Sequence, residues 1–121
     1  MSVLEFSVNT AELDGNAFVV TAAGEADMHT APTLEQALQG IVGLGGTSVV
    51  VDLSEVSFID STVLSLFLRH RERFEELGGD LVIVSGDRRI LRTFEITGLD
   101  RIFTIEPNLA QGIAQALGPG G

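Results

Sequence analysis

Hydrophobic positions follow two different periods along this chain, and the two periods alternate from one segment to the next. Short apolar or alternating runs predict strands at residues 3–8, 17–23, 47–53, 81–84 and 101–105. Between and after them, apolar residues recur at helical spacing, which predicts helices that start near Thr30 or Thr33, at Ser61, after Asp87 and at Pro107. The predicted order is therefore β-β-α-β-α-β-α-β-α, which is typical of an α/β domain.

The third predicted strand identifies the kind of sheet. Residues 47–53 show no alternation, which indicates burial on both faces and hence a central parallel strand. The turn signal at residues 14–16 joins the first two strands into an antiparallel pair. We therefore expect one domain over residues 1–121, with a mixed, mostly parallel sheet of four to five strands, about four helices and a flexible tail at 118–121.

The predicted helices have clear starts and apolar stripes. Thr30 and Thr33 are both candidate caps of the first helix, and Gln36 would complete a capping box with Thr33. The stripe of this helix consists of Leu34, Ala37, Leu38, Ile41 and Val42. A short turn after residue 53 is expected to lead into the second helix, with Asp60 and Ser61 at its start.

Composition favours a small intracellular domain. The chain has 121 residues, a mass of 12.8 kDa and no cysteine, which suits a reducing compartment. Residues 1–5 do not resemble a signal peptide, and no apolar run approaches the roughly 20 residues of a membrane span. We expect a cytoplasmic protein that does not insert into membranes.

The charge of the chain is strongly acidic and unevenly placed. The net charge is −10, with −9 in residues 1–68 and −1 in residues 69–121, where all seven basic residues are arginines. Nucleic acid is an unfavourable partner for such a chain, since its phosphates are repelled. An acidic surface can serve solubility alone, or it can steer a basic protein partner, and the sequence leaves both explanations open.

Motifs for common catalytic and metal chemistry are missing. The pair Asp27 and His29 is too small a ligand set for a metal site, and a phosphate-binding loop would need a lysine that the chain lacks. His70 is nine positions after Ser61 on the same predicted helix, about 13 Å away, so it cannot activate that hydroxyl. Hydrolysis is therefore disfavoured, and we expect no enzyme activity.

Asp60, Ser61 and Thr62 allow two explanations on local grounds. Asp and Ser are common helix caps, and the segment can be no more than a well-formed helix start. A hydroxyl at that position is also a place where an added phosphate is tolerated by the free amides of the first turn.

Two stretches of the chain resemble a known family. Residues 52–62, Asp-Leu-Ser-Glu-Val-Ser-Phe-Ile-Asp-Ser-Thr, are similar to the signature of STAS domains, and of bacterial anti-sigma factor antagonists in particular. The upstream stretch Gly-Glu-Ala-Asp at residues 24–27 resembles the family's other recurrent motif, a loop that leads into the first helix. The predicted order of strands and helices agrees with that family over essentially the whole chain.

The resemblance implies regulation of sigma-factor-dependent transcription, such as a stress response, by partner switching. The unmodified antagonist would bind an anti-sigma factor that is also a serine kinase. That kinase would use ATP to phosphorylate Ser61, with Thr62 as the second candidate, and a serine phosphatase would reset the switch. The chain itself would need no cofactor. The implied partner surface consists of Glu25, Asp27, Asp60, Ser61, Thr62 and Val63.

A STAS module in another assembly, such as a stressosome-like complex or the cytosolic component of a lipid transporter, is the alternative. The chain also departs from the family at Val63 and Ser65, where glycine is common. If Val63 lies on the surface, it would crowd a kinase at Ser61.

Overall fold

A five-stranded mixed sheet runs through the computed structural model, which describes residues 5–118. The strands are β1 (Ser7–Glu12), β2 (Ala17–Ala26), β3 (Ser48–Ile59), β4 (Leu81–Val84) and β5 (Thr104–Glu106), in that spatial order. The helices are α1 (Ala31–Gly43), α2 (Ser61–Glu76), α3 (Arg88–Thr97) and α4 (Leu109–Leu117), with a short 3₁₀ helix at Leu99–Arg101. Strand β1 is antiparallel to β2, and the other neighbours are parallel. The predicted α/β order and mixed sheet are confirmed.

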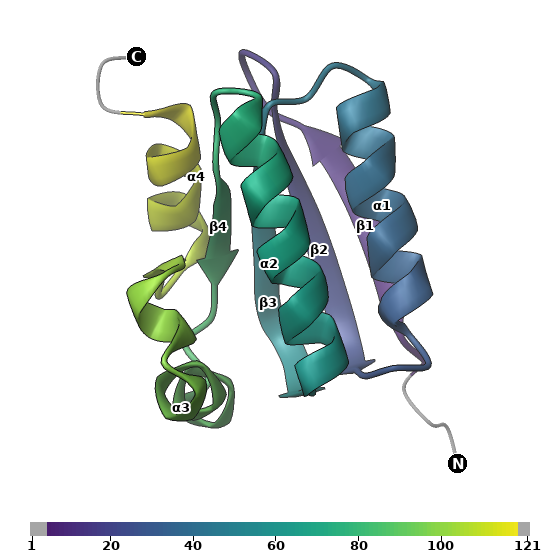
Figure 1. Cartoon of the computed structure of the whole chain (residues 1–121), viewed down its shortest axis with the longest axis vertical. Coiled ribbons are helices and arrows are strands. Elements are labelled where there is room, and N and C mark those ends of the chain that lie inside the picture. The colour runs from purple at the N-terminus through teal and green to yellow at the C-terminus, as the bar shows by residue number, and fades with distance from the viewer. Residues whose placement is uncertain (1–4, 119–121) are drawn as a thin grey trace.

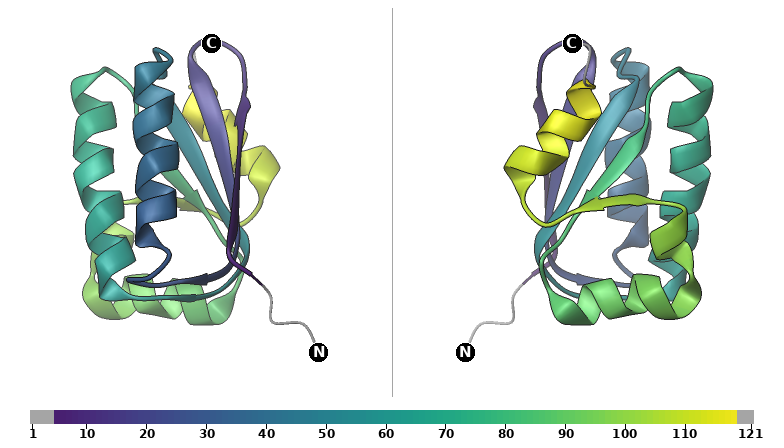
Figure 2. Two further views of the ribbon diagram at one scale, coloured as in Figure 1. Left: turned by 90° about the vertical axis from the view of Figure 1, so that its right-hand side faces the viewer. Right: turned by 90° about the vertical axis from the view of Figure 1, so that its left-hand side faces the viewer.

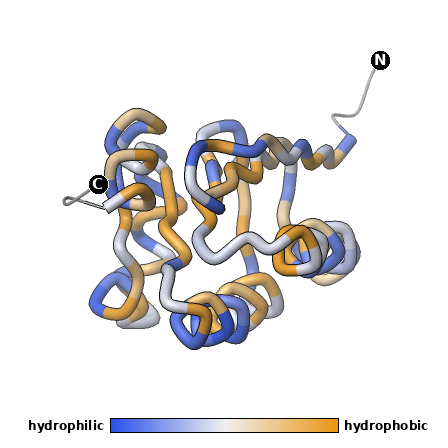
Figure 3. The backbone as a smooth tube through the Cα atoms, turned by 90° about the horizontal axis from the view of Figure 1, so that it is seen from above, coloured by the Kyte–Doolittle hydropathy of each residue, from blue (hydrophilic) through white to orange (hydrophobic). Residues whose placement is uncertain are grey.

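The two faces of the sheet are covered unequally. Helices α1 and α2 lie side by side on one face, and α4 lies on the other (Figures 1 and 2). The main core fills the space beneath α1 and α2, with Phe67, Phe74 and Leu38 among its fully buried side chains. Hydrophobic and hydrophilic positions alternate along the helices (Figure 3), as expected for helices with one buried face.

Helix α3 lies across the end of the sheet where the parallel strands finish (Figure 1). Its buried residues are Ile90 and Phe94, and the ring of Phe94 makes an edge-on contact with Phe103, with centroids 5.7 Å apart. Asp87 caps the helix and Gly98, in the left-handed conformation, ends it, as predicted.

The first two strands differ from their predicted bounds. β1 covers residues 7–12 rather than 3–8, and residues 1–4 lie outside the described part of the chain. β2 does not end at Gly24 but continues to Ala26. Gly24 has φ +105 and lies at an irregularity in the pairing with β3, so the residue that was expected to end the strand instead forms a bulge within it.

Strand β3 is longer than predicted, and the short turn expected after residue 53 is wrong. The strand continues to Ile59 and pairs with the extended part of β2. In this part only Val56 and Ile59 are buried, whereas Ser54, Glu55, Ser57 and Phe58 are exposed. Exposed polar residues such as Ser54, Glu55 and Ser57 give this part of the strand the composition of a turn, which explains the wrong prediction.

The remaining differences concern element ends. Thr30 is the N-cap of α1 but makes no side-chain cap hydrogen bond, and the capping box at Thr33 is not formed. The last strand begins at Thr104 because the 3₁₀ helix occupies residues 99–101. α4 begins at Leu109, capped by Asn108. Of the tail expected at 118–121, residues 119–121 lie outside the described residues.

Candidate functional site

The two sequence motifs, residues 24–27 and 52–62, meet at the ends of β2 and β3. Ala26 and Ile59 are paired neighbours in the sheet, and the Asp60 N–H donates to the Ala26 carbonyl at 3.1 Å. The loop that leaves β2 and the helix that follows β3 therefore start side by side. The carboxyl ends of neighbouring parallel strands are a common place for a functional site in α/β proteins.

Asp60 connects the two motifs directly. Its Oδ1 accepts the Val63 N–H at 3.1 Å, which is the N-cap hydrogen bond of α2. Its Oδ2 accepts the Met28 N–H at 3.0 Å from the other motif. With both oxygens occupied, Asp60 positions the surface rather than offering a free carboxylate to a partner.

Asp27 has a similar role within its own loop. Its Oδ1 accepts the backbone N–H groups of His29 at 2.9 Å and Thr30 at 3.1 Å, while Thr30 Oγ1 donates to the Glu25 carbonyl at 3.0 Å. This is the way in which Asp side chains order tight turns. The carboxylate of Glu25 is exposed, so it remains a candidate for direct contact with a partner.

The hydroxyl residues lie at the surface, and the valine that follows does not. Ser61 and Thr62 are exposed in the first turn of α2, and within residues 5–118 neither hydroxyl has a hydrogen-bond partner. Val63 is fully buried in the main core. Its side chain therefore lies inside the domain rather than on the surface that a partner would contact, and it does not crowd Ser61. Ser65, the other departure from glycine, is exposed.

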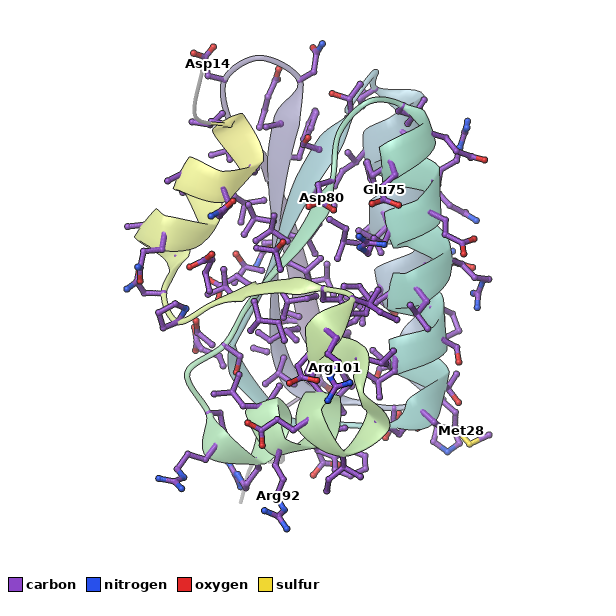
Figure 4. All side chains as sticks on the ribbon, turned by 60° about the vertical axis from the view of Figure 1, so that its left-hand side comes forward. Asp14, Met28, Glu75, Asp80, Arg92 and Arg101 are labelled. Atoms are coloured by element: carbon purple, nitrogen blue, oxygen red, sulfur yellow. The ribbon has the colours of Figure 1, made fainter. Side chains whose placement is uncertain are left out.

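A shallow groove begins beside the hydroxyls and follows the seam between α1 and α2. Its lining residues are Met28, Ala31, Pro32, Glu35, Thr62, Ser65, Leu66 and Arg69. The Met28 side chain is 63% exposed and projects from the end of the molecule in Figure 4. An exposed, flexible methionine beside polar groups is typical of surfaces that bind other proteins.

Glu35, Arg69 and His70 connect the two helices beside this groove. Glu35 of α1 accepts hydrogen bonds from two residues of α2, Arg69 at 3.3 Å and the buried His70. The hydrogen bond with His70, with a smaller contribution from Arg69, holds the pKa of Glu35 below its ordinary value of 4.5, although burial opposes the shift. The cluster connects α1 to α2 behind the exposed hydroxyls.

His70 contacts Glu35 and is not placed to activate Ser61, since the two residues are more than two helical turns apart. Among residues 5–118, no group of three or more potential metal-ligating side chains comes together. No helix in this described part combines the length and the apolar character needed to cross a bilayer.

Sequence reasoning missed three contributors to the site: Met28, Glu35 and the buried position of His70. His70 lies on the same helical stripe as Val63, Phe67 and Phe74, so its burial was open to prediction from spacing. The contact of Glu35 with His70 and Arg69 was not open to prediction from spacing, because it depends on how α1 and α2 pack against each other.

Comparison with known proteins identifies the family of the chain. The family model of the STAS domain matches residues 7–112, which is most of the chain. The chain belongs to the STAS domain family. Both motifs of the site fall within the matched region of this STAS domain.

Relatives of this STAS domain carry a consistent name. It is 34% identical over 103 residues to the anti-sigma-B factor antagonist of Listeria monocytogenes, covering 85% of this chain and 90% of that protein. The anti-sigma-B factor antagonist of Bacillus subtilis is 33% identical over 98 residues, covering 81% of this chain and 89% of that protein. A crystal structure of an anti-sigma factor antagonist from Mycobacterium paratuberculosis superposes with a TM-score of 0.81 at 30% identity, covering 93% and 95% of the two chains.

Proposed function

We propose that this STAS domain is a non-enzymatic anti-sigma factor antagonist whose binding is switched off by phosphorylation of Ser61. The observation that carries the proposal is the exposed hydroxyl of Ser61 in the first turn of α2, beside the Asp60 that connects both motifs. The names of the relatives that match nearly their whole length support the role of antagonist.

Phosphorylation at this position would leave the fold intact. The free amides and the positive end of the helix dipole tolerate a phosphate on the first turn of α2. Asp60 already occupies the cap position and Val63 remains in the core, so neither has to move. The modified protein should therefore be folded and differ mainly in surface charge.

The same phosphate would weaken an interface that covers Ser61. It adds about −1.5 to −2 charges at pH 7 to a half of the chain that is already acidic. Burying a dianion without a compensating cation costs several kcal/mol. A loss of about 2.7 kcal/mol already corresponds to about 100-fold in affinity, so charge alone is a sufficient switch.

In this proposal the partner is an anti-sigma factor that also acts as a serine kinase. The kinase uses ATP as the phosphate donor, the chain needs no cofactor of its own, and a serine phosphatase restores the unmodified form. The partner is expected to contact Glu25, the two hydroxyls and the groove that starts at Met28. Asp27 and Asp60 hold that surface in place through backbone hydrogen bonds.

The direct test is phosphate transfer. The purified chain is incubated with ATP and candidate anti-sigma kinases, and the peptide that contains Ser61 and Thr62 is analysed by mass spectrometry. We expect one phosphate, on Ser61. Transfer to Thr62 alone would move the switch to the groove side of the helix, and lack of transfer by every kinase that binds the chain would contradict the proposal.

Two variants test the effect on binding. Ser61→Ala should bind the anti-sigma partner as the wild type does, because it removes the modifiable hydroxyl and adds no charge. Ser61→Asp should keep its circular dichroism spectrum but bind at least about tenfold more weakly. Isothermal titration calorimetry provides the measurement, and equal affinity of the two variants would contradict a charge switch at Ser61.

The alternative of a STAS module in another assembly makes a different prediction. Such a module would co-purify with a transporter ATPase or with a large complex of STAS proteins, and no kinase would label Ser61. The antagonists above, matched over most of their length, favour the first proposal.

A further inference from the structure

Helix α3 is electrostatically unlike the rest of the molecule. It carries three arginines and one glutamate, and no other helix or strand within residues 5–118 has a net positive charge. This helix belongs to a chain with a net charge of −10. Its positive charge therefore stands out from an otherwise acidic or neutral surface.

Two of these arginines lack a carboxylate partner. Arg89 is paired with Asp87 at 2.8 Å, an interaction that lowers the pKa of Asp87 to about 2. Arg88 and Arg92 are exposed, and neither lies within 4.0 Å of a carboxylate in the described part of the chain. The three arginines of α2 are each paired with an acidic residue.

The unpaired arginines of α3 destabilise the isolated chain electrostatically. Arg88 and Arg92 are one helical turn apart, where like charges repel. Arg88 and Arg89 also occupy the first turn of α3, where cations are opposed by the helix dipole. Carboxylates brought by another molecule would remove both penalties, because guanidinium groups bind carboxylates with two parallel hydrogen bonds.

An apolar residue completes the outer face of α3. Ile96 is 72% exposed and follows Arg92 by one turn, on the side of the helix opposite the buried Ile90 and Phe94. Arg88, Arg89, Leu91, Arg92 and Glu95 line a hollow on the same face. In Figure 4 the Arg92 side chain projects away from the domain at the same end of the molecule as Met28.

We propose that the outer face of α3, defined by Arg88, Arg92 and Ile96, binds an acidic protein segment that also carries an apolar side chain. Carboxylates of that segment would pair with the two free guanidinium groups, and its apolar residue would cover Ile96. Nucleic acid and anionic membranes fit less well, because such extended polyanions would also be repelled by the acidic remainder of the chain. This surface is separate from Ser61 and goes beyond the proposed function.

A synthetic peptide serves as the probe. A fluorescein-labelled peptide of repeated Asp-Glu-Leu-Glu units is titrated with the full chain, and binding is followed by fluorescence anisotropy and by amide chemical shifts. We expect the largest shifts between Arg88 and Ile96. Arg88→Gln combined with Arg92→Gln should weaken binding at least about tenfold, and Ile96→Ser at least about threefold.

The matched control removes the same charge elsewhere. Arg71→Gln combined with Arg73→Gln lowers the net charge equally on α2, so it should leave peptide affinity within about twofold. Ser61→Asp should also bind the peptide normally, which separates this proposal from the switch at Ser61. The proposal would be overturned if the peptide did not bind the wild type at all. It would also be overturned if both double arginine variants lost the same peptide affinity, or if Ser61→Asp lost peptide affinity. Stronger shifts of α3 with phosphatidylglycerol vesicles or single-stranded DNA would overturn the choice of a protein segment.

Discussion

At the scale of single residues, Asp60 determines the shape of the site more than Ser61 does. One of its oxygens caps α2 and the other holds the loop before α1, through the Val63 and Met28 amides. The residue that would be modified is thus supported by a neighbour that connects two distant parts of the chain. A partner that recognises both motifs depends on this one carboxylate.

Two substitutions separate the two bonds of Asp60. Asp60→Ala removes both and should lower the free energy of unfolding by about 1–2 kcal/mol, the usual cost of a lost N-cap. Asp60→Asn keeps one oxygen for the cap, since Asn caps helices about as well as Asp, but it cannot accept the second bond. Urea denaturation should show a smaller loss for Asn than for Ala.

The loop provides the second measurement. In both variants, NMR relaxation should show greater motion of the Met28 and His29 amides, because the contact with α2 is gone. Glu55→Gln, an exposed change on β3, is the control and should alter neither stability nor relaxation. Unchanged loop motion in Asp60→Asn would contradict the bridging role.

At the scale of secondary-structure elements, the groove depends on how α1 and α2 are held together. The only charged contact between them in residues 5–118 is the cluster of Glu35 with Arg69 and His70. Because this cluster lines the same seam as Thr62 and Ser65, a partner that enters the groove would encounter it.

The Glu35 contact should make stability depend on pH in the acidic range. Its pKa is lower in the folded protein than the ordinary value of 4.5, so the stabilisation is present above that value and is lost as the pH falls through the folded pKa. Glu35→Gln should therefore be less stable than the wild type by about 1 kcal/mol at pH 7. The difference should shrink as the pH falls through the folded pKa of Glu35, which lies below the ordinary value of 4.5, because the wild-type carboxyl then becomes protonated.

Denaturation at several pH values measures this effect. Glu72→Gln is the matched control, because Glu72 is exposed on α2 and makes no ion pair in the described part of the chain. It should track the wild type at every pH. The range from about pH 3 to pH 7 spans the ordinary titration of a carboxyl group. If Glu35→Gln were less stable than the wild type by the same amount across this range, the result would contradict an ionic contribution of Glu35.

The elements also show where prediction from sequence succeeds. Periodicity located α2, and residue type placed its cap at Asp60 or Ser61, of which Asp60 is the cap in the structure, because these are local features. The buried stripe of α1 followed from spacing alone. The extension of β3 to Ile59 was missed because its exposed polar residues are held by pairing with β2, which is a tertiary effect. The role of Gly24 was wrongly predicted as the end of β2 for the same reason, since a bulge is defined by the pairing with the neighbouring strand.

For the site, the residues could be identified from the sequence. The structure shows which of them hold the loops in place and which are exposed to a partner. Asp27 and Asp60 carry the same charge as Glu25, yet their oxygens are occupied by backbone amides that lie next to them only in the folded chain. Val63 was uncertain because a residue at the third position of a helix can face either way until the packing is known. Its full burial places it in the core.

At the scale of the whole molecule, the two proposed binding surfaces differ in sign. The surface around Ser61 belongs to the acidic first half of the chain, whereas the outer face of α3 is basic. Both lie at the end of the sheet where the parallel strands finish (Figures 1 and 4). A single domain of this size could therefore hold two partners of opposite charge at one end.

Helix α4, on the face of the sheet opposite α1 and α2, is expected to open before the rest of the domain unfolds. Together with Leu13, this helix covers a small cluster of three valines, Val19, Val50 and Val84, and its Gly112 lies directly against Val84 and Val50. Regions with few buried apolar contacts open at a free-energy cost below that of global unfolding. α4 should thus detach as a cooperative unit while the Ser61 surface stays formed.

Native-state hydrogen exchange can detect this opening. Amides of α4 should exchange faster than those of α2 and should share one opening free energy in low denaturant. If the α4 amides exchanged only through the same opening that exposes the core amides, the domain would behave as a single cooperative unit and the prediction would be wrong. If α4 opens first, the strands beneath it become accessible on that face of the sheet, while the surface around Ser61 on α2, on the opposite face, stays formed.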